Sequence, residues 1–271
     1  MIRGTAVLVA HSLKRIRGLL VGLGLMLAAF QFLLTQVAAY LVRQSAFSQL
    51  SALIPDFVRS AAGPSALAFM SFSGIVGLGY FHPVVLTALV SVMITIATEP
   101  AAEIETRFVD LTLARPVARF AAATRTIVVL VVAGASLLAL MIAGTWTGLS
   151  CCAPAGVDRP SIGMLLSLTV SLGSVMACWA GVALALAAGA KRRAVAGAVA
   201  GALAFAAYLL DYLGQAWEPA RTVSRLSPFH YFQPMTIVMG GSLSGGNVAV
   251  LLAIALAGAA TGYVVFAKRD V

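Results

Sequence analysis

Residues 99–125, EPAAEIETRFVDLTLARPVARFAAATR, form the densest block of charge in a very apolar chain. The block holds four of the chain's nine carboxylates and four of its eighteen Lys/Arg residues. Uncharged runs flank it on both sides, residues 60–98 before it and residues 126–157 after it. Because so much charge is not stable in lipid, we expect this block to lie in water between two membrane-spanning segments.

Wound as a helix, the block has two distinct faces. Ile104, Phe108 and Leu111 recur at helical spacing on one face, while acidic and basic side chains follow another face. Pro116 disfavours helical geometry at the residue before it, so the helix should break there. Two interpretations remain open: a solvated loop helix held by its own ion pairs, or an amphipathic helix that docks into a groove on a soluble partner.

Residues 103–105 (EIE) and 110–119 (DLTLARPVAR) resemble the cytoplasmic loop of ABC-2-type transporter permeases. The sequence departs from the family pattern at Arg107-Phe108, where Gly-Thr is usual, and at Thr112, where Leu is usual. The resemblance implies that this loop carries a coupling helix, which transmits movement from a separate ATP-binding subunit. The residues 227–234 (SPFHYFQP) and 268–270 (KRD) also look like this family.

The resemblance implies roles for individual residues of the loop. We expect Arg115 and Pro116 to set the break in the helix, and Arg119 with Arg125 to anchor it at lipid headgroups. The expected contacts with the ATPase come from the amphipathic part of the block, namely Glu103, Glu105, Arg107, Phe108, Asp110 and Leu113.

The composition places the chain among polytopic membrane proteins. It is 61% hydrophobic and only 10% charged, with a mean hydropathy of +1.00. A soluble domain would carry about 25% charged residues. The net charge of +9 comes from short basic clusters between apolar runs, so we expect no nucleic-acid partner.

The apolar runs predict an all-α fold with six transmembrane helices in a single domain, residues 1–271. Residues 1–17 have a basic and an apolar helical face, which predicts an interfacial elbow helix, as ABC-2 permeases have; an ordinary positively charged flank is the alternative. Residues 64–78 are expected to be external or half-inserted, and residues 214–247 to form an external connection with short helices. The predicted spans are residues 19–42, 80–98, 126–148, 162–189, 194–213 and 249–267.

Six spans place both termini on one side of the membrane. That side then holds 13 of the 18 Lys/Arg residues, including the tight basic turn at residues 191–193. The positive-inside rule therefore predicts that both termini and the block at residues 99–125 are cytoplasmic. We expect a multi-pass protein of the bacterial inner membrane.

The sequence contains no catalytic motif of the common types, such as HExxH, G-x-S-x-G or a Walker A loop, and we expect no enzyme. Residues 243–247 (LSGGN) resemble the signature of ABC ATPases, but a flexible turn explains them. His82 or His230 could form a soft metal site with Cys151 and Cys152, although free thiols and interfacial histidines are the simpler interpretation. Asp211, the one charge near the end of the fifth predicted span, is expected to be an interfacial or loop-capping residue, with a residue of the transport pathway as the alternative.

We therefore expect the permease subunit of an ABC-2-type transporter, usually an exporter. The family implies a second permease copy, identical or similar, and two copies of an ABC ATPase that binds ATP and Mg²⁺; this chain is expected to bind no cofactor itself. A periplasmic protein is a further partner that the sequence leaves open. The alternatives are a membrane scaffold or assembly factor, or a mechanotransmitter that moves no solute.

Overall fold

The computed structural model describes residues 2–44, 71–105, 121–154 and 156–268. Every regular element in these ranges is a helix, and six helices or helix pairs are long and apolar enough to cross a membrane. The predicted all-α fold with six spans agrees with this count. The candidate spans are Val7–Arg43, Phe72–Ala97, Ala123–Cys152, Ile162–Gly189, Arg193–Ala216 and Gly245–Phe266.

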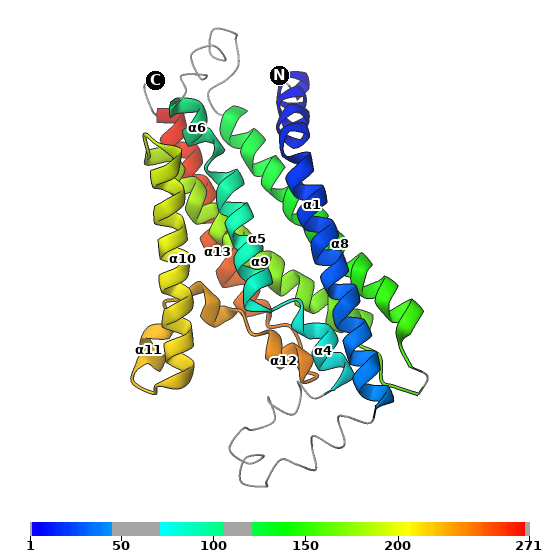
Figure 1. Ribbon diagram of the computed structural model, residues 1–271. Helices are drawn as coiled ribbons and strands as arrows, with labels where there is room; N and C mark the ends of the chain where they lie inside the picture. Colours follow the sequence, from blue (N-terminus) through cyan, green and yellow to red (C-terminus); the bar gives the residue numbers. More distant parts are fainter. Residues whose placement is uncertain (1, 45–70, 106–120, 155, 269–271) are drawn as a thin grey trace.

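The helices run roughly alongside one another, and their ends gather at two opposite ends of the bundle (Figure 1). The N-terminal end of α1 (Ile2–Arg43) and the C-terminal end of α13 (Gly245–Lys268) lie at the same end as α6 (Glu99–Glu105). We call this the α6 end. The opposite end, with α4 (Phe72–Leu78), α11 (Ala220–Ser224) and α12 (Pro234–Val238), is the α4 end.

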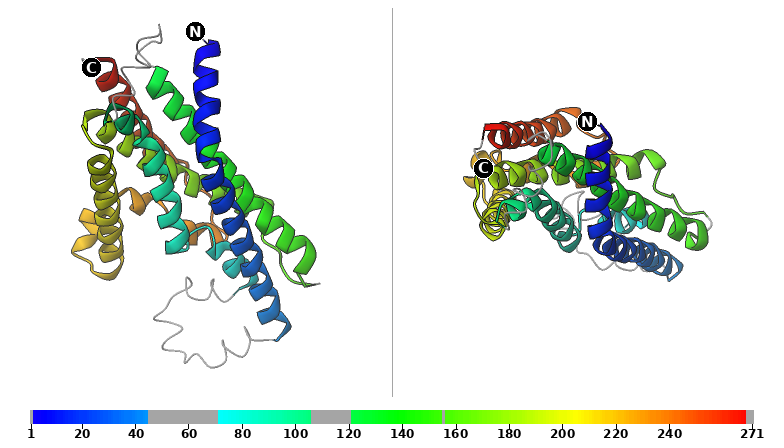
Figure 2. Two further views of the ribbon diagram at one scale, coloured as in Figure 1. Left: turned by 45° about the horizontal axis from the view of Figure 1, so that its top comes forward. Right: turned by 90° about the horizontal axis from the view of Figure 1, so that it is seen from above.

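The predicted interfacial helix (residues 1–17) and the first span belong to one continuous helix. Helix α1 continues without interruption through residues 17–19, because no proline or capping residue stops it there. Its 42 residues make a rod of about 63 Å at the usual rise per residue. Since a bilayer core is about 30 Å thick, part of α1 must extend beyond it, and Figure 2 shows that the helix changes direction near its N-terminal end.

The second span is built from two helices rather than one. Helix α4 ends at Leu78, and α5 (Pro83–Ala97) starts at a proline, where His82 Nδ1 accepts a hydrogen bond from the Val84 N–H at 3.3 Å. Helix α5 therefore starts three residues later than the predicted span, and the partly buried α4 precedes it within the same candidate span. In the turn between them Tyr80 is fully buried, with its hydroxyl 3.1 Å from Thr145 Oγ1.

The third span, α8 (Ala121–Cys152), is longer than predicted at both ends. Cys151 and Cys152 lie beyond the predicted end of this span at residue 148 but form the last turn of α8, because the first helix-stopping residue is Pro154. The Gln36 side chain of α1 donates a hydrogen bond to Cys152 Sγ at 2.7 Å. The first residues of the predicted loop thus belong to the contact between α1 and α8.

The last three spans follow the prediction closely. They are α9 (Ile162–Gly189), α10 (Arg193–Ala216) and α13, with α11, the 3₁₀ helix η1 (Pro228–Tyr231) and α12 in the connection between α10 and α13. The residues that resemble an ATPase signature lead into α13, where Ser244 Oγ accepts a hydrogen bond from the Asn247 N–H. In this structure Ser244 is the N-terminal cap of α13, and the residues after it form the first turn of that helix.

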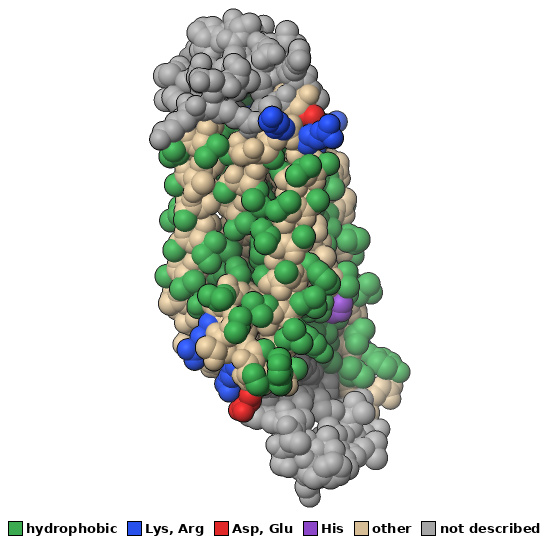
Figure 3. All heavy atoms as spheres, turned by 90° about the vertical axis from the view of Figure 1, so that its left-hand side faces the viewer, with side chains coloured by type: hydrophobic (Ala, Val, Ile, Leu, Met, Phe, Trp, Pro, Cys, Tyr) green, Lys and Arg blue, Asp and Glu red, His purple; other side chains and the backbone are tan. Residues whose placement is uncertain are grey.

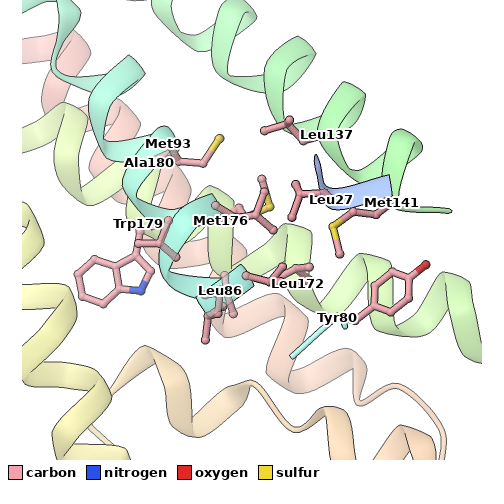
Figure 4. Packing of buried hydrophobic residues seen from close by; sticks show 14 of the residues in the cluster. Leu27, Tyr80, Leu86, Met93, Leu137, Met141, Leu172, Met176, Trp179 and Ala180 are labelled. Carbon is pink, nitrogen blue, oxygen red and sulfur yellow. The ribbon is translucent and has the colours of Figure 1, made fainter. Parts of the chain in front are cut away.

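The core of the bundle forms around α9. In its most apolar window 67% of α9 is buried, compared with 11% for α10 and α13. Met176 and Leu172 of α9 lie among Leu27, Met93 and Met141 from three other helices (Figure 4). On the face drawn in Figure 3, hydrophobic side chains cover the middle of the bundle and charged side chains lie toward its two ends, as expected for a surface in contact with lipid.

Two helix pairs pack backbone to backbone through glycines. A β-carbon at Gly144 of α8 would lie 2.3 Å from the Ala28 carbonyl oxygen of α1, and one at Gly258 of α13 would lie 2.4 Å from the Gly181 backbone of α9. Small residues permit this close approach in membranes, where packing replaces the hydrophobic effect. Of the small-residue pairs in the sequence, Gly144/Gly148 and Gly258/Gly262 pack inside the chain, whereas Gly18/Gly22 and Gly197/Gly201 have nothing within 4 Å.

This contrast gives a stability prediction. We expect Gly258→Ala to destabilise the protein by about 1–3 kcal/mol, because the added methyl group meets backbone that must move. Gly201→Ala, with open space around it, should change stability by less than about 0.5 kcal/mol. Thermal unfolding in detergent, followed by tryptophan fluorescence, measures both variants, and equal melting temperatures would contradict the packing described here.

Candidate functional site

Helix α6 is a short amphipathic element at the α6 end of the bundle. Thr98 separates it from α5, with its hydroxyl donating to the Thr95 carbonyl at 3.1 Å. The helix carries three of the chain's nine carboxylates, Glu99, Glu103 and Glu105. Each carboxylate contacts an arginine, either through the guanidinium or, for Glu105, through the backbone N–H. These arginines lie on three different spans.

Glu99 connects α6 to the first and fifth spans. Its carboxylate forms an ion pair with the Arg15 guanidinium of α1 and a second one, at 3.3 Å, with Arg193 of α10. The Glu99 side chain is only 20% exposed, whereas Arg15 is 61% exposed. One carboxylate therefore bridges two helices that are far apart in the sequence.

Arg193 makes two further contacts with this region. Its backbone N–H donates to Glu105 Oε2 at 3.0 Å, and its guanidinium donates to the Thr95 carbonyl at 3.0 Å. Glu105 thereby satisfies one of the free N–H groups at the start of α10 and places a negative charge at the positive end of the helix dipole. The start of α10 is thus held by α6 through both backbone and side-chain contacts.

Glu103 connects α6 to the third span through a nearly buried ion pair. Its Oε1 lies 2.7 Å from Arg125 Nη1 of α8, and the two side chains are 16% and 8% exposed. The prediction that Arg125 anchors the loop at lipid headgroups is therefore wrong, because its guanidinium points into the protein and meets Glu103. We call Arg15, Glu99, Glu103, Glu105, Arg125 and Arg193 the α6 hub.

The buried pair in the α6 hub allows a stability prediction. Glu103→Gln should destabilise the protein by about 3 kcal/mol, because it leaves the Arg125 charge buried without a counter-charge. Replacing both residues, Glu103→Leu with Arg125→Met, should recover most of that loss. Melting temperatures in detergent test this, and a double variant no more stable than Glu103→Gln would contradict the argument.

The α6 hub includes only part of the predicted coupling residues. Glu103 and Glu105 lie in α6 as described, whereas Arg107, Phe108, Asp110, Leu113, Arg115, Pro116 and Arg119 lie outside the described residues. Sequence reasoning missed the role of Glu99 and both arginines that bind it. The available signal was the grouping of Arg15, Arg193 and the acidic block on one side of the predicted topology.

The metal hypothesis receives no support from the described residues, in which no group of three His, Cys, Asp or Glu side chains could hold an ion. His82 caps α5, as described above. His230 lies instead beside Asp211, with its Nδ1 3.7 Å from Asp211 Oδ1. Asp211 also accepts a hydrogen bond from Gln215 one turn later in α10, at 2.8 Å.

The fold and the site define a helical, multi-pass membrane protein with a charged element at one end that binds three spans. A comparison with protein families agrees with this class: the model described as "Multidrug efflux system permease Rv1217c, C-terminal domain" matches residues 5–267. The chain belongs to this permease family, and the predicted relationship to ABC-2-type permeases is confirmed. No curated protein matches the chain. No solved structure matches it either.

Proposed function

We propose that this chain is the permease subunit of an ABC-2-type multidrug exporter, driven by a separate ABC ATPase that binds ATP and Mg²⁺. The support is the family match over residues 5–267, since that family is described as a multidrug efflux permease. The observation that carries the mechanism is the α6 hub. A helix of only seven residues, whose Glu103 and Glu105 belong to the segment that resembles the family's cytoplasmic loop, is ion-paired to α1, α8 and α10.

The α6 hub supplies a route for force into the membrane. A displacement of residues 106–120 by the ATPase would pull on α6, to which that segment is covalently joined. The ion pairs of Glu99 and Glu103 would then pass the displacement to α1, α8 and α10 together, while α5 follows through Thr98. ATP can bias this movement only by stabilising one arrangement of the spans over another.

The proposed assembly has two permeases and two ATPases in the bacterial inner membrane, with the α6 end in the cytoplasm. The positive-inside bias supports this orientation. The open surfaces of α1 and α10, which carry the unpacked pairs Gly18/Gly22 and Gly197/Gly201, suit contact with a second permease copy. A periplasmic partner would meet the α4 end.

Reconstitution tests the proposal. The chain should co-purify with an ABC ATPase, and inverted vesicles holding the pair should move the neutral dye Nile red in an ATP-dependent manner. An ATPase variant without its Walker A lysine is the matched control and should abolish this movement. Failure to co-purify any ATPase would contradict the proposal, whereas a stable complex without dye movement would contradict export and favour a transmitter of mechanical force.

A further inference from the structure

A second site lies at the α4 end, away from the α6 hub. A cavity of about 670 Å³ is bounded by the end of α10, by α11 and η1, and by the starts of α5 and α12. Its walls combine aromatic rings with acidic side chains, namely Phe81, Tyr208, Phe229, Phe232, Asp211 and Glu218. A cavity of this size suits a drug-sized molecule.

Asp211 is the unusual member of this lining, because it is the one carboxylate within the described membrane spans. Its side chain is 14% exposed. Its described partners are Gln215, which is neutral, and His230, which neutralises a carboxylate only when it is protonated. No Lys or Arg of the described chain lies within ion-pairing distance of it. A carboxylate is expensive at such a position, so its presence indicates a functional counter-ion.

The aromatic wall is fixed in place. The Phe229 ring is stacked on Trp179 at 5.7 Å between ring centres and meets Tyr208 edge to face at 5.6 Å. Ser227 holds the start of η1 against α10, with its hydroxyl donating to the Ala207 carbonyl at 2.7 Å. The rings therefore form a preorganised apolar surface next to the Asp211 carboxylate.

This combination selects a class of ligand. Aromatic faces attract cations, and a carboxylate in an apolar surrounding strengthens that attraction. The lining holds two carboxylates, Asp211 and Glu218, against one guanidinium, Arg221, so an anion would be disfavoured. A coordinated metal ion is disfavoured as well, because the described residues offer no third ligand beside Asp211 and His230.

We propose that the cavity at the α4 end binds an amphipathic organic cation, with Asp211 as its counter-charge and the rings of Tyr208, Phe229 and Phe232 against its apolar part. The permease alone is expected to bind the cation. Only the further statement that this cavity binds substrate during export rests on the proposed function. The charged groups that face the cavity from α10 and the following connection are Asp211, Glu218, Arg221 and His230.

The test compares two probes of the same shape and opposite charge. The full chain in lipid nanodiscs is dialysed against radiolabelled tetraphenylphosphonium or tetraphenylborate, with empty nanodiscs subtracted. We expect the cation to bind with a Kd about tenfold lower than that of the anion, a preference that one well-placed charge can supply. Equal binding of the two probes would overturn the proposal without the need for any variant.

Variants then identify the carboxylate. Asp211→Asn should raise the Kd of tetraphenylphosphonium about tenfold and should not raise the Kd of tetraphenylborate. Asp211→Glu should retain binding within about threefold, since it keeps the charge. Asp158→Asn, which removes an exposed charge at the same end but outside the cavity, should change nothing.

The outcomes also separate this inference from the proposed function. Loss of cation binding in Asp211→Asn, while the complex still moves the neutral dye Nile red, is the expected pattern. Unchanged cation binding in Asp211→Asn would refute the site and leave the exporter assignment intact. If Asp211→Asn fails to fold, as judged by gel filtration, the comparison of the two probes on the unaltered chain still tests whether the cavity prefers a cation.

Discussion

Replacing Glu99 by lysine should remove most ATP-driven transport and leave the six spans folded. Glu99 bridges Arg15 of α1 and Arg193 of α10, so the reversal places three cations together and breaks both links. The stability loss should be about 1–3 kcal/mol, because Glu99 is only 20% exposed although its partner Arg15 is largely exposed. The loss of coupling is expected to be about tenfold or more, within the usual range of coupling free energies.

The measurement is ATP-dependent dye movement by reconstituted complex, with melting temperature recorded on the same preparation. Asp158→Lys provides the matched control, since it makes the same charge change on an exposed residue beside α4, at the opposite end of the bundle. Adding Arg15→Glu and Arg193→Glu to Glu99→Lys should restore part of the activity, because the pairs form again with reversed polarity. Transport at the normal rate in Glu99→Lys would contradict a role for this bridge.

The second large effect is expected from reversing Glu105 and Asp110 together. Glu105→Lys removes the acceptor for the Arg193 N–H and places a cation at the positive end of α10, which is unfavourable. Asp110→Lys reverses charge in the segment expected to touch the ATPase. Drug stimulation of ATP hydrolysis should fall to the basal rate, while the membrane spans keep their melting temperature within a few degrees.

Charge-neutral replacements provide the control for this experiment. Glu105→Gln with Asp110→Asn retains hydrogen-bond acceptors at both positions and should keep more of the drug-stimulated ATPase activity than the reversal. The reading of this segment as a coupling element fails if the double reversal retains full drug-stimulated hydrolysis. Loss of the complex on gel filtration, with an intact permease, would place the defect in ATPase binding rather than in force transmission.

The parts of the fold that depend on local composition could be predicted from the sequence. Residues 162–189 form a helix with the predicted bounds, because an uncharged apolar run ends there at a basic turn. The start of α5 at Pro83 also has a local cause, since proline favours the first turn of a helix. Such signals lie within one segment and need no knowledge of its neighbours.

The parts that depend on long-range contact could not be predicted. Nothing local distinguishes Gly258, which touches the α9 backbone, from Gly201, which touches nothing. Arg125 is the last residue of the charged block and fits a headgroup anchor equally well until Glu103 is seen opposite it. The continuous α1 was missed because the basic face of residues 1–17 suggested a separate helix, although no residue there stops one.

Asp211 illustrates the same limit at the α4 end. Its position near the end of an apolar run favours an interfacial role, and the sequence does not reveal that residues 229–232 return to face it. The chain reverses through α11 and η1, and this brings His230 to the carboxylate from 19 positions away. The charge was evident in the sequence, but the cavity that gives it a function was not.

Cross-linking from position 108 tests the central claim most directly. Benzoylphenylalanine in place of Phe108 retains an aromatic side chain and reacts with whatever lies against it when irradiated. The account predicts a covalent product with the ABC ATPase, in a yield that changes when ATP binds. The same group at the exposed Trp217, between the end of α10 and α11 at the α4 end, should give none. A product from position 217 but not from position 108 would contradict the account.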